Sequence, residues 1–202
     1  MNNLSLLPLG ITLLMAPASA APCAKATLAS YIALGSSGCL LGNLLVSDFA
    51  YHRNADGGAA EITADQIDVT PLIVPGNYAL QFAAPWSVEG GQSQASKITY
   101  QVHAQATSIQ VQQLSLDGNG FEAGMFGNVI VNETFASPAG NTGNLEVFLK
   151  CTEVCRSHTS ANVSITPTGA LVIVDKVTLK SKLGHAALAS FTDWLVVCPQ
   201  CV

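Results

Sequence analysis

The stretch KITYQVHAQ, residues 97–105, alternates strictly between apolar and polar side chains. One face carries Ile98, Tyr100, Val102 and Ala104. The other carries Lys97, Thr99, Gln101, His103 and Gln105. Because successive side chains of a strand point to opposite sides of a sheet, this period of two predicts a β-strand with one face in the core and one in solvent.

The residues that follow predict a hairpin with this strand. Residues 106–108 (ATS) form the expected turn, after which Ile109 and Val111 begin a second alternating stretch. The apolar parity then shifts by one residue to Leu114, and a β-bulge near residues 112–113 would restore it. The outer face of this hairpin is expected to carry mainly uncharged amides and hydroxyls.

Short alternating stretches recur from about residue 44 and are separated by Gly, Pro, Asn or Asp. The candidate strands are residues 44–51, 60–69, 78–88, 97–105, 109–116, 128–136, 144–150, 162–167, 170–180 and 186–197. Strands at this spacing predict an all-β fold, an antiparallel β-sandwich or flattened barrel of about 8–10 strands. Residues 24–34 have helical spacing before a Gly-Ser-Ser-Gly stop, which predicts one short N-terminal helix.

The charge balance argues against a nucleic-acid partner. Of the 202 residues only 10% are charged, and eight Lys and Arg against thirteen Asp and Glu give a formal net charge of −5. Nucleic-acid-binding domains carry a basic patch or stripe, which this composition does not suggest. For the same reason, long-range attraction of anionic ligands is not expected.

Residues 1–20 have the pattern of a secretory signal peptide. An apolar run over residues 4–15 precedes Ala18-Ser19-Ala20, a small-residue cleavage site, although the first three residues contain no Lys or Arg. No later run has the length of a membrane span. We therefore expect an exported chain, secreted or in the cell envelope, whose mature part is a single domain over residues 21–202.

Six cysteines in an exported chain are expected to form disulfides. They are Cys23, Cys39, Cys151, Cys155, Cys198 and Cys201. Cys23 and Cys39 have no close competitor and are expected to pair. The clusters at residues 151–155 and 198–201 either bond locally or cross-link to each other. A zinc site formed by these two clusters with His158 is disfavoured by the C-x-x-x-C spacing.

The sequence contains no nucleophile elbow, zincin helix, phosphate loop or dinucleotide fingerprint. The acidic residues Glu61, Asp65 and Asp68 are close in sequence but lack the aromatic platform of a sugar subsite. Residues 117–122 (DGNGFE) contain only a fragment of a calcium loop, and a Gly-rich turn is the simpler interpretation. No catalytic, cofactor-binding or metal-binding residues are therefore predicted.

Several short motifs resemble those of one known family. They are residues 27–31, GCLLG at 38–42 leading into DFAY at 48–51, residues 62–71, and GQSQASKITYQV at 91–102. In these the chain resembles secreted bacterial proteins of the PEP-CTERM class. The C-terminal sorting tail of that class is absent, since this chain ends in CPQCV. The resemblance implies export and association with extracellular polysaccharide, and it assigns no catalytic residues.

Two classes of function follow from these observations. The first is a non-enzymatic structural or interaction module of the extracellular matrix, which acts by binding or self-association and needs no cofactor. The alternative is a carbohydrate-binding module, and an unrecognised hydrolase comes third. The possible ligand face consists of Trp86, Thr99, Gln101, His103 and Gln105, with Trp86 as the aromatic platform.

Overall fold

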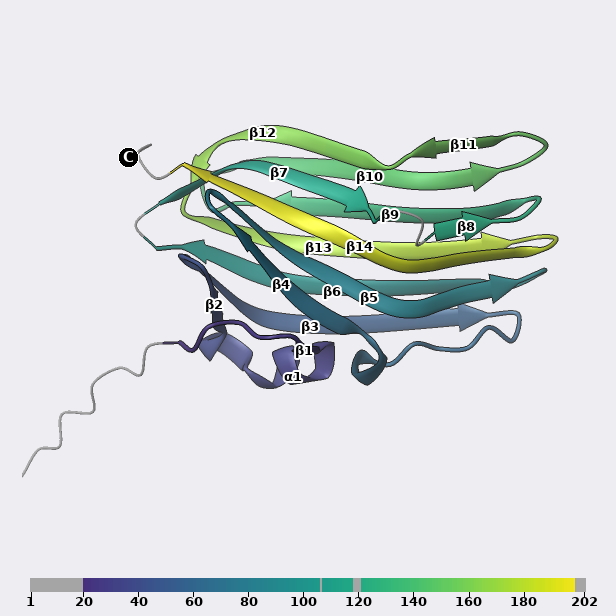
Figure 1. Cartoon of the computed structure of the whole chain (residues 1–202), viewed down its shortest axis with the longest axis horizontal. Helices are drawn as coiled ribbons and strands as arrows, with labels where there is room; N and C mark the ends of the chain where they lie inside the picture. Colours follow the sequence, from purple (N-terminus) through teal and green to yellow (C-terminus); the bar gives the residue numbers. More distant parts are fainter. Residues whose placement is uncertain (1–19, 106, 118–120, 199–202) are drawn as a thin grey trace, which may run out of the picture.

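The chain folds into two antiparallel β-sheets packed face to face, as Figure 1 shows. The computed structural model describes residues 20–105, 107–117 and 121–198. The predicted sandwich with a short N-terminal helix is confirmed, and the sheets do not close into a barrel. The predicted signal peptide lies almost wholly outside the described residues and stays a prediction.

Sheet A has seven strands in the order β11-β10-β9-β13-β6-β3-β2. Their bounds are β2 Cys39–Leu41, β3 Leu44–Asp56, β6 Ser93–Ala104, β9 Gly127–Ala136, β10 Thr142–Cys151, β11 Cys155–His158 and β13 Ala170–Ser181. Within it, β6 pairs with β3 on one side and β13 on the other. The outward side chains of these central strands therefore lie next to one another.

Sheet B has the order β1-β4-β5-β14-β7-β12, and β8 also pairs with β14. Its strands are β1 Ala26–Thr27, β4 Asp68–Val74, β5 Asn77–Glu89, β7 Ser108–Leu116, β8 Phe121–Ala123, β12 Ser160–Thr168 and β14 His185–Cys198. The inward apolar positions of both sheets form one core. Within that core two pairs of rings stack. The ring centroids of Phe49 and Tyr100 are 5.1 Å apart, and those of Phe82 and Phe191 are 5.2 Å apart.

The helical segments are shorter than the sequence predicts. Helix α1 covers Leu28–Ala33, and the 3₁₀ turns η1 and η2 cover Gly35–Ser37 and Ala64–Gln66. Helix α1 begins late because the preceding residues pair with β4 as strand β1, and Thr27 caps the first turn by accepting from the Ser30 N–H. No helix in the described part of the chain has the length and apolar character needed to cross a membrane.

The predicted strand at residues 60–69 is wrong over most of its length. The Thr63 and Gln66 side chains form a capping box around η2, which satisfies local backbone groups that a strand would pair with a neighbour. Strand β4 consequently starts only at Asp68.

The predicted hairpin between residues 97–105 and 109–116 is also wrong. Strand β6 belongs to sheet A, whereas β7 pairs with β14 and β12 in sheet B. The chain thus passes from one sheet to the other between them. Alternation identifies which face of each strand is buried, but it does not identify the pairing partner.

The predicted β-bulge in β7 exists, but it lies earlier than expected. Strand β7 carries one extra residue, Gln110, where its register against β14 shifts. Val111 is therefore only partly buried, whereas Gln112 points inward and is completely buried. An amide thus occupies a core position that the sequence pattern did not indicate.

Two disulfides join described residues. Cys23 pairs with Cys39 as predicted, and it fixes the N-terminal segment beside β2. Cys151 pairs with Cys155 across the β10–β11 turn, so neither is linked to the C-terminal cysteines or available as a zinc ligand. Cys198 is also disulfide-bonded, and Cys201 lies outside the described residues.

Candidate functional site

Basic residues are distributed unequally between the two sheets. The strands of sheet A carry six of the eight Lys and Arg residues of the chain, whereas those of sheet B carry none. The six are Arg53, Lys97, Lys150, Arg156, Lys176 and Lys180. The positive charge is therefore concentrated in one of the two layers.

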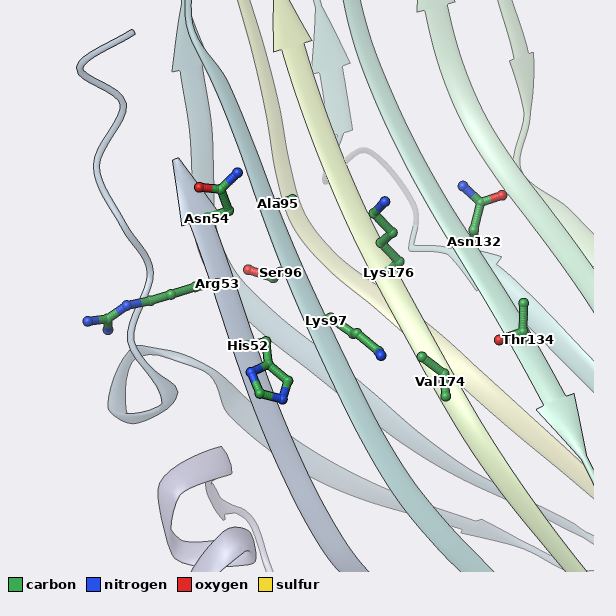
Figure 2. A pocket seen from close by; sticks show the side chains of 10 residues that line it. All are labelled: His52, Arg53, Asn54, Ala95, Ser96, Lys97, Asn132, Thr134, Val174 and Lys176. Carbon is green, nitrogen blue, oxygen red and sulfur yellow. The ribbon is translucent and has the colours of Figure 1, made fainter. Parts of the chain in front are cut away.

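A hollow of about 390 Å³ lies on the outer face of sheet A, over β3, β6, β13 and β9. We call it the cationic hollow. Its lining residues, shown in Figure 2, are His52, Arg53, Asn54, Ala95, Ser96, Lys97, Asn132, Thr134, Val174 and Lys176. This lining contains basic, amide and hydroxyl groups but no carboxylate.

A single row of cross-strand neighbours forms the floor of the hollow. His52 lies opposite Lys97, Lys97 opposite Lys176, and Lys176 opposite Asn132. The strand register thus places two lysines opposite each other on adjacent strands, and Figure 2 shows both side chains in the lining of the hollow. Like charges in such a position destabilise a sheet.

Neither lysine of this pair is neutralised within the described part of the chain. Both Lys97 and Lys176 are exposed, and no described carboxylate forms an ion pair with them. Arg53 differs, because its guanidinium turns away from the hollow and binds Glu61, with Nε and Oε2 2.8 Å apart. The hollow therefore keeps two ammonium groups that no described carboxylate neutralises.

A second group of basic residues lies further along the same face. Lys180 of β13 is four residues beyond Lys176, roughly 13 Å along the strand. Lys150 and Arg156 lie opposite each other on β10 and β11. The Lys150 ammonium binds Glu146 at 2.9 Å, which leaves Lys180 and Arg156 as the unpaired charges of this group among the described residues.

Part of the predicted ligand face lies beside the hollow. Thr99, Gln101 and His103 share the outer side of β6 with Lys97, as the alternation predicted. Thr99 lies opposite Val174, one of the lining residues. Gln105 follows the end of β6 and does not extend this row.

The prediction that Trp86 forms an aromatic platform is wrong. Its side chain is 1% exposed and packs in the core, where its ring lies tilted against that of Phe191, and its indole Nε1 donates to Ser96 Oγ at 3.0 Å. The sequence contained the signal, because Trp86 has the same parity in β5 as Phe82 and Val88, which are buried. A buried indole cannot stack on a sugar ring.

The acidic motifs considered in the sequence form no site in the described structure. Glu61 pairs with Arg53, and Asp65 lies in the exposed η2 turn. Asp117 accepts hydrogen bonds from Gln81 Nε2 at 3.0 Å and Thr192 Oγ1 at 2.7 Å. Residues 118–120 of the calcium-loop fragment lie outside the described residues.

A cluster of carboxyl groups, which the sequence patterns did not predict, lies inside the sandwich. Glu133, Asp175 and Asp193 are fully buried, and one oxygen of each lies within 4.8 Å of the others. Alternation could have revealed them, since Glu133, for example, lies between the inward residues Val131 and Phe135. We call these three residues the core carboxyl cluster.

Burial controls the protonation of this cluster. Removal from water raises the pKa of Asp193 to about 7, and the hydrogen bond from the Tyr100 hydroxyl lowers this pKa in part. Burial, reinforced by the nearby Asp193 charge, raises the pKa values of Glu133 and Asp175 well above the ordinary range. Charged carboxylates are therefore unfavourable here unless an opposite charge accompanies them.

Comparison with known proteins identifies no family. No family model matches the chain, and no curated protein matches it. The resemblance to the PEP-CTERM class therefore stays a prediction.

Three solved structures show a distant likeness to the fold. The module TmCBM61, solved with β-1,4-galactotriose, is 14% identical over 73% of this chain and 85% of its own, with a TM-score of 0.31. The enzymatically active domain of tailspike protein 4 from bacteriophage CBA120 is 12% identical over 76% of this chain and 19% of its own, with a TM-score of 0.29. The mannan-recognising module TmCBM27 is 9% identical over 86% of this chain and 96% of its own, with a TM-score of 0.27. Likenesses this distant assign no ligand to this chain.

Proposed function

We propose that this chain is a non-enzymatic, exported β-sandwich module that binds an acidic polysaccharide on the outer face of sheet A. The observation that carries the proposal is the opposed pair Lys97 and Lys176, exposed and without a described carboxylate partner. A sheet that retains an unfavourable pair of like charges gains from an anionic ligand that lies between them.

The other lining groups suit the rest of such a ligand. The amides of Asn54 and Asn132 and the hydroxyl of Thr134 can exchange hydrogen bonds with sugar hydroxyls. The hollow lies on an open sheet face, which favours an extended chain over an enclosed small molecule. Since its lining includes no Trp, Tyr or Phe, recognition would depend on charge and hydrogen bonds rather than on stacking.

The overall charge does not oppose this proposal. A local cluster of like charges creates its own field, which attracts a counter-ion even when the net charge of the protein has the other sign. The disulfides support export, because such bonds persist in oxidising compartments. Export and a place in the extracellular matrix are parts of the proposal.

Binding to the polyuronate alginate, compared with neutral dextran, tests this function. We expect alginate to bind with an affinity that falls as NaCl is raised, and dextran not to bind. The double variant Lys97→Gln/Lys176→Gln should lose affinity by on the order of tenfold or more, because two charge-assisted contacts are removed.

The matched control is Lys25→Gln, which removes an exposed lysine outside both sheets. It has the same effect on net charge per substitution and should leave alginate binding unchanged. Equal binding of dextran and alginate, or a double variant that binds like the unaltered protein, would contradict the proposal.

Self-association in the matrix is a second candidate, and it rests on a different surface. Met125, Val154 and Leu183 are 62%, 71% and 60% exposed, and they lie in the β8–β9, β10–β11 and β13–β14 turns at one end of the sandwich (Figure 1). Exposed apolar residues grouped in this way favour contact with another apolar surface. Light scattering on the concentrated protein should show oligomers that a triple Ser variant at these residues abolishes, and a strictly monomeric protein would exclude this role.

A further inference from the structure

The core carboxyl cluster joins the two sheets at the middle of the sandwich. Glu133 of β9 and Asp175 of β13 lie directly opposite each other in sheet A. Asp193 of β14 reaches them from sheet B. All three side chains are 0% exposed, so water does not solvate them.

Most oxygens of this cluster have no hydrogen-bond partner. Tyr100 and Gln112 both donate to Asp193, the former from its hydroxyl and the latter from Nε2. The four carboxyl oxygens of Glu133 and Asp175 have no hydrogen-bond partner among the described residues. Both of these donors therefore bind Asp193.

The amide of Gln112 gives an independent indication of a ligand. This side chain is completely buried, and its Nε2 bond to Asp193 holds the amide within the cluster. Its Oε1 has no hydrogen-bond partner in the part of the chain that the structure describes. A neutral acceptor left unpaired among carboxylates needs a donor or a cation, since burying it alone is unfavourable.

No basic side chain of the protein can supply the missing positive charge. The described Lys and Arg residues are exposed or only partly buried, and the buried polar residues include no His, Lys or Arg. Unpaired carboxylates in an apolar interior are very costly. The cluster requires either bound protons or a metal ion.

We propose that the core carboxyl cluster, with Gln112, is a calcium site that joins the two sheets. Glu133, Asp175 and Asp193 each place one oxygen in the cluster, and bidentate binding by Glu133 and Asp175 together with the Oε1 of Gln112 would raise the number of ligand oxygens to six. Calcium takes six to eight oxygen ligands at about 2.3–2.6 Å, so oxygens on opposite sides of the ion lie up to roughly 5 Å apart. The three grouped carboxyl oxygens, which lie within 4.8 Å of one another, fit within that span.

The ligand set favours calcium over other common ions. Zinc prefers imidazole and thiolate ligands, and this cluster contains neither. Magnesium retains several water molecules, for which a fully buried core is unsuited. One calcium ion would also offset two of the three carboxylate charges.

Complete burial couples calcium binding to folding. The ligands come from both sheets, so the site exists only when the sandwich has closed around the ion. Calcium would therefore act as a cross-link between sheet A and sheet B. This role is independent of any ligand on the outer face of sheet A.

Refolding with and without calcium tests the proposal. The protein, with its disulfides intact, is unfolded in guanidinium and EDTA and then refolded in excess CaCl₂, MgCl₂ or EDTA. After gel filtration, we expect elemental analysis to find calcium bound in a one-to-one ratio only in the CaCl₂ sample. The melting temperature in MgCl₂ or EDTA should be lower by on the order of 10 °C, since the binding free energy no longer stabilises the fold.

The double variant Glu133→Gln/Asp175→Asn preserves side-chain size and removes two charges. It should bind no calcium and melt at the same temperature in CaCl₂ and EDTA. The control Glu89→Gln changes an exposed carboxyl on β5 and should respond to calcium as the unaltered protein does. If the double variant does not fold, the calcium content of the unaltered protein decides.

One result overturns the proposal. That result is an unaltered protein that refolds without bound calcium, melts at the same temperature in CaCl₂ and EDTA, and loses stability as the pH rises through neutrality. That behaviour would show that the cluster holds protons instead of a metal ion.

Discussion

Sheet A and sheet B share a core but differ in surface chemistry. Six basic residues lie on the strands of sheet A and none on those of sheet B, where exposed acids include Asp68, Glu89 and Glu122. The formal net charge of −5 is the sum over the whole chain, including residues outside both sheets, so it describes neither layer. A ligand that approaches this protein meets one face, so the charge of that face determines what can bind.

The difference is possible because only the inward positions must be apolar. In β6 and β13 of sheet A, as in β5 and β14 of sheet B, alternate residues fill the common core. The outward residues are not constrained by that packing, and they can be basic in one layer and neutral or acidic in the other.

The largest effect is expected on the free energy of unfolding, when a buried and a partly exposed tryptophan are each replaced by alanine. Trp86→Ala should reduce the free energy of unfolding by about 3–5 kcal/mol, because it leaves a cavity in the core. Trp194→Ala, on the partly exposed outer side of β14, should cost much less. Urea denaturation measures both, and similar values would contradict the inward position of Trp86.

Reversing the charge of the cationic hollow should affect ligand binding next most strongly. The double variant Lys97→Glu/Lys176→Glu should weaken alginate binding by on the order of 100-fold or more, because attraction becomes repulsion. The matched variant Lys25→Glu/Lys182→Glu makes the same change in net charge at two exposed lysines outside the strands of both sheets, and it should change binding little. Equal losses in the two variants would show that net charge, not the face of sheet A, determines affinity.

Alkaline pH should destabilise the N-terminal segment that packs beside sheet A. Burial raises the pKa of the Tyr31 hydroxyl to about 12, and this group donates to the Ala24 carbonyl at 2.9 Å. A folded-state pKa above the unfolded value of about 10 means that this stability is present below pH 10 and is lost as the pH rises through 12. Tyr31→Phe should therefore cost about 1 kcal/mol at neutral pH and progressively less in alkali.

Thermal melting across this pH range measures the Tyr31 effect. The control is Val88→Ala, a buried position on β5 of sheet B that carries no titratable group, for which the difference from the unaltered protein should stay constant with pH. A constant difference for Tyr31→Phe as well would show that the hydroxyl is not desolvated.

The smallest expected effect is the change in protein stability when one lysine of the cationic hollow is replaced. Lys97→Gln removes one member of the opposed lysine pair and should stabilise the ligand-free protein by about 0.2–1 kcal/mol. The gain should decrease as NaCl is added, because salt screens exposed charges. A loss of stability at low salt would mean that the two ammonium groups do not repel each other.

Much of the fold could be predicted from the sequence, but little of the candidate site could. The alternation in residues 97–105 correctly indicated which side chains of β6 are buried, and Cys23 and Cys39 were correctly paired. The alternation could not indicate that β13, more than sixty residues later in the chain, would place Lys176 opposite Lys97. Pairing depends on contacts between distant segments, and a period of two contains no information about them.

The hairpin and bulge predictions show the same limit at closer range. Strands β6 and β7 are neighbours in sequence, yet they belong to different sheets. The bulge was anticipated, but its exact position decided whether Val111 or Gln112 entered the core. A shift of a residue or two was enough to place an amide beside Asp193.

The sequence by itself determined that this chain is built from strands, which faces of β6 are buried, and that an N-terminal disulfide forms. Those properties follow from side-chain period and from the spacing of a few residues, which are local. Only the tertiary structure decided which strands are neighbours, that basic residues gather on sheet A, and that three carboxyl groups from two sheets meet in the core. The reason is physical: charges and ligand oxygens act through distances in space, and folding sets those distances between residues far apart in the chain.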